Sequence, residues 1–337
     1  MYSSKADLIK TLDQLHKVTV LVVGDIILDR YIWGAVDRIS PEAPVPVVDV
    51  KKVEERLGGA GNVARNLRSI GAAVNICGFI GDDKEGQMVL ELFKQDGIGH
   101  EGVMIDRARP TSVKTRVIAQ SQQVVRIDRE VRAPHNVAMR EGFAAVVDTH
   151  VDSSNAIILS DYGKGVVSET LLRRFSLARE AGRIGLETRP LMLDPHPANY
   201  GIYGQVCIAK PNRREAEAAS GVRILDRMSA AQAAEVLLKK WQAGMILVTL
   251  GEDGLLIRCA GDEEPFMLET VARQVFDVSG AGDTVTAIFA TAVAAGASPV
   301  LAGELANIGA GIAVSQVGTV AVGRDTLLEE IERLTAD

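Results

Sequence analysis

Short apolar runs alternate with longer helical patterns along the chain, and this alternation constrains the fold more than any other feature. The runs are rich in Val, Ile, Leu and Ala without a polar alternation, which is typical of strands buried on both faces. They occupy residues 18–23, 74–79, 156–159, 191–193, 206–209 and 246–250. Strands of this kind, separated by helices, predict an α/β fold with a mainly parallel sheet between two layers of helices.

Polar residues follow several of the predicted strands. They lie at residues 24–25, 160–161, 194–195, 210–212 and 249–251 and include Asp, Ser, Lys, Asn and Thr. Parallel strands present their carboxyl ends at one edge of a sheet, where α/β proteins bind ligands. We therefore expect the functional site at this edge.

Two segments break the alternation. Residues 45–53 follow a proline-rich stretch, and residues 111–128 alternate apolar with polar side chains, so both resemble edge strands. They predict a small separate sheet within a single domain of residues 1–337, with lid segments at about 31–56 and 110–130. This sheet would either close over a ligand or join two copies of the chain. Because exposed strand edges need cover, we expect a homodimer.

Composition excludes several classes of protein. The formal net charge of −7 and the pI near 5.4 argue against nucleic acid as a partner. No stretch reaches the ~20 apolar residues of a membrane-spanning helix, and residues 1–17 lack the apolar region of a signal peptide. Cys77, Cys207 and Cys259 are far apart, which suits a reducing compartment and offers no metal site. We expect a cytoplasmic protein without a membrane partner.

A glycine-rich turn at residues 278–284 leads into a helix. Apolar residues follow it at positions 285, 288, 289, 292 and 293, which is helical spacing. Unpaired N–H groups at a helix N-terminus attract anions, and Gly280 and Gly282 leave the backbone open to a phosphate. Asp283 then either stabilises the first helical turn or acts as a carboxylate in phosphoryl transfer.

A second glycine cluster lies at residues 58–64. Gly59, Gly61 and Ala64 fit the spacing of a dinucleotide fingerprint, but that fingerprint should follow the first strand of a βαβ unit. Here it follows a charged segment. We favour a glycine turn that lets backbone N–H groups and Asn62 approach a polyhydroxy ligand. The P-loop and protein-kinase motifs are absent, so a nucleotide would bind in another way.

Two pairs of polar residues each allow two interpretations. Asp25 and Asp29 follow the first predicted strand, where a carboxylate either accepts hydrogen bonds from sugar hydroxyls or caps a helix. Asn212 and Glu215 have the spacing of a capping pair, and the same groups suit the hydration shell of Mg²⁺ beside phosphates.

Taken together, these motifs resemble the ribokinase-like carbohydrate kinase family in order and spacing. Residues 58–64, Asn212 with Glu215, and residues 280–283 occupy the places of its motifs, and the match covers nearly the whole chain. The resemblance implies a ribokinase-like fold with a small β lid. It also implies transfer of the γ-phosphate of ATP, with Mg²⁺, to a sugar or sugar phosphate.

Within that family, residues 24–31, 38–46, 110–116 and 159–165 are similar to the bacterial heptose 7-phosphate kinases. This resemblance implies phosphorylation of the anomeric hydroxyl of D-glycero-β-D-manno-heptose 7-phosphate, for the inner core of lipopolysaccharide. Some relatives carry a fused nucleotidyltransferase domain. Because the kinase pattern continues to Asp337, we expect a separate protein to add the nucleotide.

The resemblance also implies roles for individual residues. Asp283 is expected to be the base, with the N–H groups of Gly280, Ala281 and Gly282 facing the migrating phosphoryl group. The residues expected at ATP are Asn212, Arg213, Arg214, Glu215 (through Mg²⁺-bound water), Thr249, Gly251, Gly254 and Asn307. The residues expected at the sugar are Asp25, Asp29, Gly58, Gly59 and Asn62, with Arg38, Lys114, Arg116 and Lys164 as candidates for its phosphate.

Three other activities stay open at this point. The first is a related kinase for another sugar, sugar phosphate or nucleoside. The second is a nicotinamide-dependent oxidoreductase that uses residues 59–64. The third is a sensor that binds a sugar and a nucleotide without forming ADP, although the intact turn ending in Asp283 argues against it.

Overall fold

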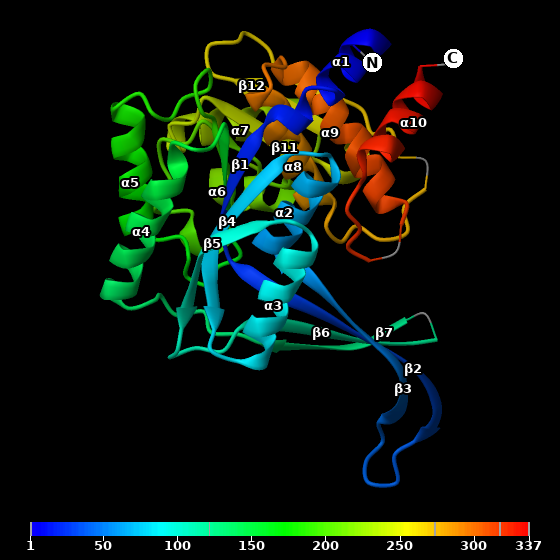
Figure 1. Ribbon diagram of the computed structural model, residues 1–337. Helices are drawn as coiled ribbons and strands as arrows, with labels where there is room; N and C mark the ends of the chain where they lie inside the picture. The colour runs from blue at the N-terminus through cyan, green and yellow to red at the C-terminus, as the bar shows by residue number, and fades with distance from the viewer. Residues whose placement is uncertain (1, 121, 273, 317, 336–337) are drawn as a thin grey trace.

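The predicted parallel sheet is present, with nine strands in the order β13-β12-β11-β10-β9-β8-β1-β4-β5 (Figure 1). The computed structural model describes residues 2–120, 122–272, 274–316 and 318–335. The strands are β1 (Thr19–Gly24), β4 (Ala73–Gly81), β5 (Gly99–Asp106), β8 (Ala156–Ser160), β9 (Leu191–Asp194), β10 (Ile208–Ala209), β11 (Met245–Thr249), β12 (Leu255–Cys259) and β13 (Phe266–Leu268). The pairs from β11 to β5 are parallel, and β12 and β13 extend the sheet antiparallel.

Three of these strands were missed by the apolar-run pattern. The strand β5 lies at the sheet edge and is only partly buried, so it lacks a continuous apolar run. The strands β12 and β13 are short antiparallel additions at the other edge. The other six central strands coincide with the predicted runs, with β10 shorter than expected.

The chain reverses its direction of travel across the sheet at β1. From β1 it proceeds to β4 and β5 on one side, and then returns to β8 on the other side. Gly24 at the end of β1 pairs with Ser160 at the end of β8. A crevice opens outside the carboxyl ends of the strands at such a reversal, because the following connections leave toward opposite faces. This reversal therefore positions the site.

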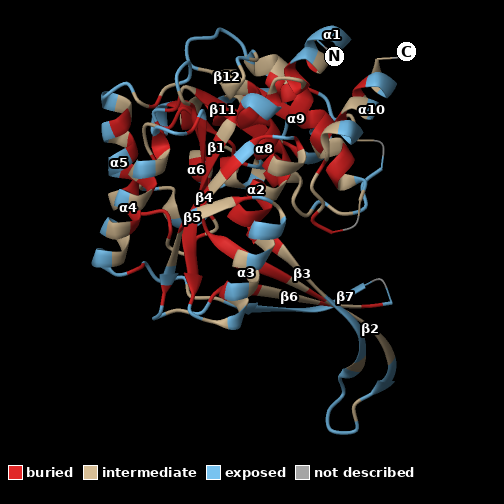
Figure 2. Ribbon diagram, in the orientation of Figure 1, coloured by how far each residue is buried: buried red, intermediate tan, exposed pale blue. Residues whose placement is uncertain are grey.

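Helices cover both faces of the large sheet, with α4 to α7 on one side and α2, α8 and α9 on the other (Figure 1). Residues 283–292 of α8 are all buried, because this helix lies between the sheet and its neighbours α2 and α9 (Figure 2). None of the described helices is both long and apolar enough to cross a bilayer. The helices are α1 (Lys5–Leu12), α2 (Ala60–Ser69), α3 (Lys84–Gln95), α4 (Val137–Val151), α5 (Glu169–Glu180), α6 (Arg213–Ser220), α7 (Arg227–Lys240), α8 (Ala281–Ala294), α9 (Pro299–Val314) and α10 (Arg324–Leu334).

The predicted small sheet is also present. It contains β2 (Ile26–Ile39), β3 (Pro46–Gly59), β6 (Ser112–Ala119) and β7 (Gln122–Arg129) in the order β3-β2-β6-β7. The hairpin of β2 and β3 projects from the body of the molecule and is exposed at its tip (Figures 1 and 2). The first residues of β2 are buried against the large sheet. One strand thus connects the sheet reversal to the projecting lid.

A tight turn connects β11 to β12, with the Leu250 N–H donating to the Gly254 carbonyl oxygen at 2.8 Å. Gly251 and Gly254 both have positive φ angles, of 68° and 88°. A Cβ on Gly254 would collide with the Leu268 carbonyl oxygen, whereas nothing lies within 4 Å of a Cβ on Gly251. The two glycines therefore meet different constraints.

We predict that Gly254→Ala lowers the free energy of unfolding by about 3 kcal/mol or more, because backbone strain and overpacking add. The matched control Gly251→Ala should lose only about 1 kcal/mol from its φ angle. Urea unfolding of the two variants measures the difference. Equal losses would contradict the packing argument.

Candidate active site

Asp283 lies where three distant segments meet. It is 8% exposed, in the first turn of α8, and the preceding Gly280 adopts the left-handed conformation with φ of 81°. The Asn62 amide donates to Asp283 Oδ2 at 2.6 Å, and the Tyr162 hydroxyl donates to Oδ1 at 2.6 Å. The carboxylate is thus held by side chains from α2 and from the turn after β8. Neither of these bonds is a helix-capping contact.

Burial raises the pKa of Asp283 to about 6. The hydrogen bonds from Asn62 and Tyr162 favour the ionised form and oppose this shift, while the charge of Asp194 adds to it. A carboxyl group that titrates near neutral pH is suited to exchange a proton with a bound hydroxyl. The half-buried Gly280, Ala281 and Gly282 leave the N-terminus of α8 accessible beside it.

Lys210 was expected among the polar residues at the strand ends, but no motif assigned it a specific role. Its side chain is 4% exposed, and its Nζ lies 3.1 Å from Asp194 Oδ1. Burial alone would lower the pKa of Lys210, but the charges of Asp194 and Glu215 outweigh it and raise the pKa above its usual value. A Cβ on Gly282 would lie 3.3 Å from the Lys210 ammonium. A permanent cation therefore faces the glycine turn, as an anion site requires. Its position directly after a predicted strand was the available signal.

Asn212 and Glu215 form the capping box that their spacing allowed. The Asn212 side chain accepts from the Glu215 N–H at 3.0 Å, and Glu215 Oε2 accepts from the Asn212 N–H at 2.8 Å. Burial and the charge of Asp194 raise the pKa of Glu215. The capping interpretation is correct. Only one of the two Glu215 carboxylate oxygens, Oε2, takes part in the capping box. Among the described residues, no group of three or more His, Cys, Asp or Glu is arranged to hold a metal by itself.

The residues expected at ATP converge on the carboxyl end of β11. The backbones of Thr249 and Asn212 form an isolated parallel β-bridge. The Arg213 guanidinium donates to the Leu250 carbonyl oxygen at 3.2 Å. Gly254 packs against residues 268–270. In the same region the Asn307 amide donates to the Glu269 carbonyl oxygen at 2.7 Å, and Gly251 begins the short helix η3 (Gly251–Asp253). Arg214 is exposed at the start of α6.

The residues expected at the sugar gather at the base of the lid. Asp29 is 5% exposed and accepts from Arg116 at 2.6 Å. A Cβ on Gly58 would lie 2.5 Å from Asp29 Oδ2, and Gly59 precedes α2 with φ of 56°. Asn62 Oδ1 is buried without a hydrogen-bond partner. A buried amide oxygen in this state favours binding of a donor such as a sugar hydroxyl.

Asp25 lies in a different environment from Asp29. It is 1% exposed, and Oδ2 accepts from the N–H groups of Tyr162 and Lys164 at 2.8 and 3.0 Å. Its Oδ1 accepts from the Val166 N–H at 3.2 Å. Burial and the neighbouring Asp161 raise the pKa of Asp25 to about 6. In this structure its contacts anchor the turn at residues 162–166.

The four basic candidates are not all in one place. Arg116 pairs with Asp29, and Lys114 Nζ lies 5.9 Å from the centroid of the Tyr162 ring. Lys164 Nζ pairs with Glu130 Oε2 at 2.6 Å. Arg38 is exposed near the far end of β2, nine residues from Asp29, which corresponds to about 30 Å along a strand. The structure does not bring Arg38 to the other three.

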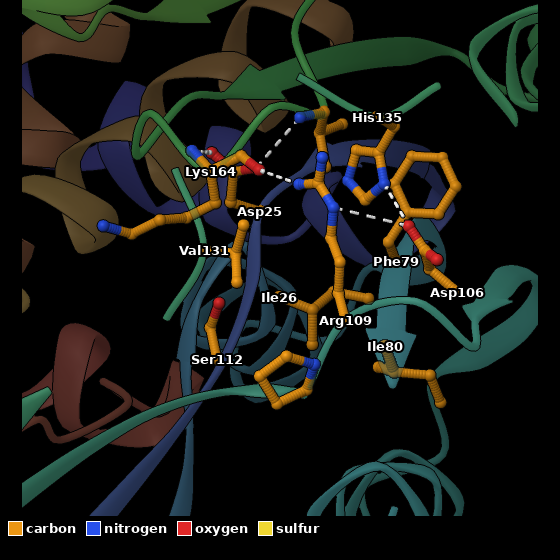
Figure 3. Close-up of a pocket in the computed structure, with 12 residues that line it drawn as sticks. Asp25, Ile26, Phe79, Ile80, Asp106, Arg109, Ser112, Val131, His135 and Lys164 are labelled. Carbon is orange, nitrogen blue, oxygen red and sulfur yellow. Dashed lines mark hydrogen bonds and ion pairs between the residues drawn. The ribbon is translucent and has the colours of Figure 1, made fainter. Parts of the chain in front are cut away.

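A small cavity of about 30 Å³ adjoins the Asp25 turn (Figure 3). At its wall the Arg109 guanidinium donates to the Lys164 carbonyl oxygen at 3.4 Å and lies 3.5 Å from Asp106. Asp106 in turn bonds His135 at 2.7 Å. The cavity has room for one or two waters and not for a sugar. Through Arg109, the cavity lining contacts the same turn that Asp25 anchors.

The glycine cluster does not have the context of a dinucleotide fingerprint. Gly58 and Gly59 end β3, which pairs antiparallel with β2 in the small sheet. A dinucleotide fingerprint requires the first parallel strand of a βαβ unit. The geometry instead favours the glycine turn at a polyhydroxy ligand.

Comparisons with known proteins agree with this geometry. The family described as pfkB family carbohydrate kinase matches residues 17–326. The bifunctional protein HldE of Pelobacter propionicus is 42% identical over 96% of this chain and 65% of its own length. HldE of Desulfatibacillum aliphaticivorans is 44% identical over 93% of this chain and 63% of its own length. The chain therefore spans somewhat less than two thirds of these relatives.

Solved structures share the fold. Arabidopsis thaliana ribokinase complexed with ribose and ATP superposes with a TM-score of 0.71 at 20% identity, over 94% of this chain and 99% of its own. The tetrameric inhibited form of Escherichia coli phosphofructokinase-2 gives 0.77 at 18% identity, with the same coverage. The family match extends across both the lid and the Asp283 turn. The chain belongs to the pfkB family of carbohydrate kinases, with a ribokinase-like fold.

Proposed function

We propose that this chain transfers the γ-phosphoryl group of ATP to the anomeric hydroxyl of D-glycero-β-D-manno-heptose 7-phosphate, giving the 1,7-bisphosphate. The observation that carries the phosphoryl transfer is the Asp283 carboxylate, held by Asn62 and Tyr162 at the accessible N-terminus of α8. The choice of heptose rests on the resemblance of residues 24–31, 38–46 and 159–165 to heptose 7-phosphate kinases. The place of the product in lipopolysaccharide synthesis and a cytoplasmic location are parts of the same proposal.

In this mechanism Asp283 accepts the proton of the sugar hydroxyl. A carboxylate with a pKa of about 6 cannot deprotonate a free hydroxyl, so the proton moves late, as the new P–O bond forms. The first-turn N–H groups of α8 and the Lys210 ammonium stabilise the charge on the migrating group. Positioning and electrostatics supply most of the rate.

Magnesium would supply charge neutralisation between the phosphates. The residues present fit a Mg²⁺ ion that is bound through water. Mg²⁺ commonly keeps several waters and uses one or two carboxylates together with substrate phosphates. Glu215 and Asp194 are the carboxylates that face Lys210 beside the glycine turn. Asn212 and Glu215 also fix the start of α6 next to the nucleotide residues.

The sugar would lie between Asp29, Asn62 and Asp283, with the base of the lid over it. Its existing phosphate needs a cation, and Arg116, Lys114 and Lys164 are the candidates near this position. The homodimer proposal rests on exposed apolar residues of the small sheet. These are Val50, Val53, Val124, Val125 and Ile127.

An assay of ADP release tests the proposed function directly. The purified chain is incubated with ATP, Mg²⁺ and a panel of heptose 7-phosphate, heptose, ribose, fructose 1-phosphate, fructose 6-phosphate and a nucleoside. Heptose 7-phosphate should give the highest kcat/KM, and Asp283→Asn should lower kcat by roughly 10³-fold or more while ATP binding persists. A higher kcat/KM for another acceptor would identify that acceptor as the substrate in place of heptose 7-phosphate. Binding of ATP and a sugar without formation of ADP would favour the sensor, and binding of NAD would favour the oxidoreductase.

We predict that Arg116→Ala raises KM for heptose 7-phosphate by about 10-fold or more, because a charge-assisted bond to the phosphate is lost. KM for unphosphorylated heptose should change much less. Arg129→Ala is the matched control, because Arg129 lies opposite Val113 and therefore on the other face of the sheet, where it pairs with Asp83 and Glu85. Equal effects of Arg116→Ala on both sugars would remove Arg116 from the phosphate site.

We predict that Lys210→Met weakens binding of a non-hydrolysable ATP analogue by about 10- to 100-fold and weakens ADP binding much less. The physical reason is loss of the cation beside the γ-phosphate position. Calorimetric titration measures both affinities. Lys239→Met, which removes an exposed lysine paired with Glu235, is the control.

Loss of Lys210 also leaves the Asp194 carboxylate without its ion-pair partner, which destabilises a buried site. The double variant Lys210→Met with Asp194→Asn separates this effect, because neither charge is then left alone. The double variant should stay folded and still discriminate poorly between the ATP analogue and ADP. Full discrimination in a folded variant would exclude Lys210 from the γ-phosphate site.

A further inference from the structure

The turn at residues 161–166, which follows β8, is buried or half-buried and is held by several side chains. The Asp25 carboxylate accepts from three of its backbone N–H groups. The Asp161 side chain accepts from the Gly163 N–H at 2.7 Å, and Gly163 itself adopts a φ of 68°. From the other side Arg109 donates to the Lys164 carbonyl oxygen. The backbone position of Tyr162 is therefore strongly determined.

The side chain of this turn that contacts Asp283 is Tyr162. Its hydroxyl donates to Asp283 Oδ1 at 2.6 Å, and Lys114 from the lid strand β6 lies over its ring at 5.9 Å. Asn62 donates to the other oxygen of the same carboxylate. Tyr162 is thus in contact with both the lid and the proposed base. No motif in the sequence analysis assigned it a role.

We propose that Tyr162 is a positioning residue, whose phenol fixes the orientation of the Asp283 carboxylate from a turn anchored by Asp25. This inference rests on the proposed role of Asp283 in phosphoryl transfer. It assigns to Asp25 an indirect role in holding the turn, in place of direct contact with the sugar. It also places the lid strand β6 one side chain away from the base.

The geometry explains why one hydroxyl matters. A carboxylate has about four lone-pair positions, and Asn62 and Tyr162 use one on each oxygen. This leaves a defined lone pair for the acceptor hydroxyl of the sugar. Without the phenol only the Asn62 bond holds the carboxylate, which can then turn further about its terminal bond, whose rotation is broad in Asp. The fraction of molecules with a correctly aimed oxygen then falls.

The phenol also affects protonation of Asp283. The charged and titratable groups that act most strongly on the pKa of Asp283 are Tyr162, Asp194 at the end of β9 and Lys210 after β10. The Tyr162 bond favours the ionised carboxylate, so its loss raises the pKa of Asp283 above about 6. Since the reaction needs the ionised form, activity below neutral pH suffers most. Raising the pH should restore part of it.

The experiment compares Tyr162→Phe with Tyr203→Phe. Tyr203 is a matched control because its buried hydroxyl donates to Asp161 at 2.5 Å, in the same turn but away from Asp283. The first readout is the ¹³C NMR titration of labelled Asp carboxyl groups, with Asp283 assigned by its loss in Asp283→Asn. Tyr162→Phe should raise the Asp283 midpoint by about one pH unit or more, and Tyr203→Phe should leave it in place.

The second readout is the pH dependence of kcat with an accepted sugar. Unphosphorylated heptose is the preferred acceptor here, because a phosphate group itself titrates near pH 6. Tyr162→Phe should lower kcat by about 10-fold or more at pH 7 with a smaller change in KM for ATP, and its acid limb should move to higher pH. Thermal unfolding shows that each variant is folded.

Two outcomes would overturn the inference. One is an Asp283 titration that is the same in Tyr162→Phe and in the unaltered protein. The other is an equal shift in Tyr203→Phe, which would mean a general loosening of the turn. The NMR titration uses no substrate, so it tests Tyr162 even if the chain phosphorylates a different sugar or none. Failure of the proposed function is therefore seen separately, in the ADP-release assay.

Discussion

Packing of carboxylates at the reversal between β1 and β8 is the constraint on which the rest of the site depends. Strand ends and one helix start bring together Asp25, Asp161, Asp194 and Asp283, with Lys210 as the buried cation among them. Each carboxylate is held by donors, because an unpartnered buried charge is costly. Asp161, for example, accepts from the Asn199 amide and the Tyr203 hydroxyl. The fold is organised around these bonds as well as around its apolar core.

This charge distribution has consequences for both ligand binding and stability. Negative groups outnumber the buried lysine, so a polyphosphate would need additional cations to approach, which agrees with a magnesium-bound nucleotide. Asp25 and Asp283 have folded-state pKa values of about 6, above the ordinary 3.8. Between pH 3.8 and about 6 the folded state therefore binds more protons than the unfolded state. The two groups lower the free energy of unfolding as the pH rises through this range to about 6. Their backbone, amide and phenol donors limit that cost.

Much of the architecture could be predicted because it depends on local pattern. Continuous apolar runs identified six strands of the large sheet, and residues 45–53 and 111–128 identified β3, β6 and β7 of the small sheet. The strand β2 was not predicted. The glycine turn before α8 was recognisable from its two glycines and from the helical spacing of the apolar residues that follow. The structure adds that Gly280 adopts the left-handed conformation. The edge strand β5 and the antiparallel β12 and β13 were missed, since each is only partly buried and lacks a long continuous apolar run. Long-range pairing defines them instead.

The site itself shows where sequence reasoning ends. Lys210 and Tyr162 follow predicted strands, yet nothing local says that one faces Gly282 and the other reaches Asp283. Asp25, between β1 and β2, and Asp29, in β2, illustrate the same point. Both are buried carboxylates, but Asp25 receives three backbone N–H groups from a returning turn, whereas Asp29 receives an arginine from the lid.

The partner of each aspartate decides what it is free to do. A carboxylate whose oxygens are occupied by backbone donors mainly determines the shape of the turn around it. A carboxylate paired with a charged side chain can exchange that partner for a ligand hydroxyl at lower cost, because an alternative charge-assisted bond is available to both groups. Asp29 and Arg116 meet this condition at the base of the lid, where a sugar and its phosphate would together replace their ion pair. On this argument, substrate binding and lid position are linked through β2 and β6, the two strands that carry Asp29 and Arg116.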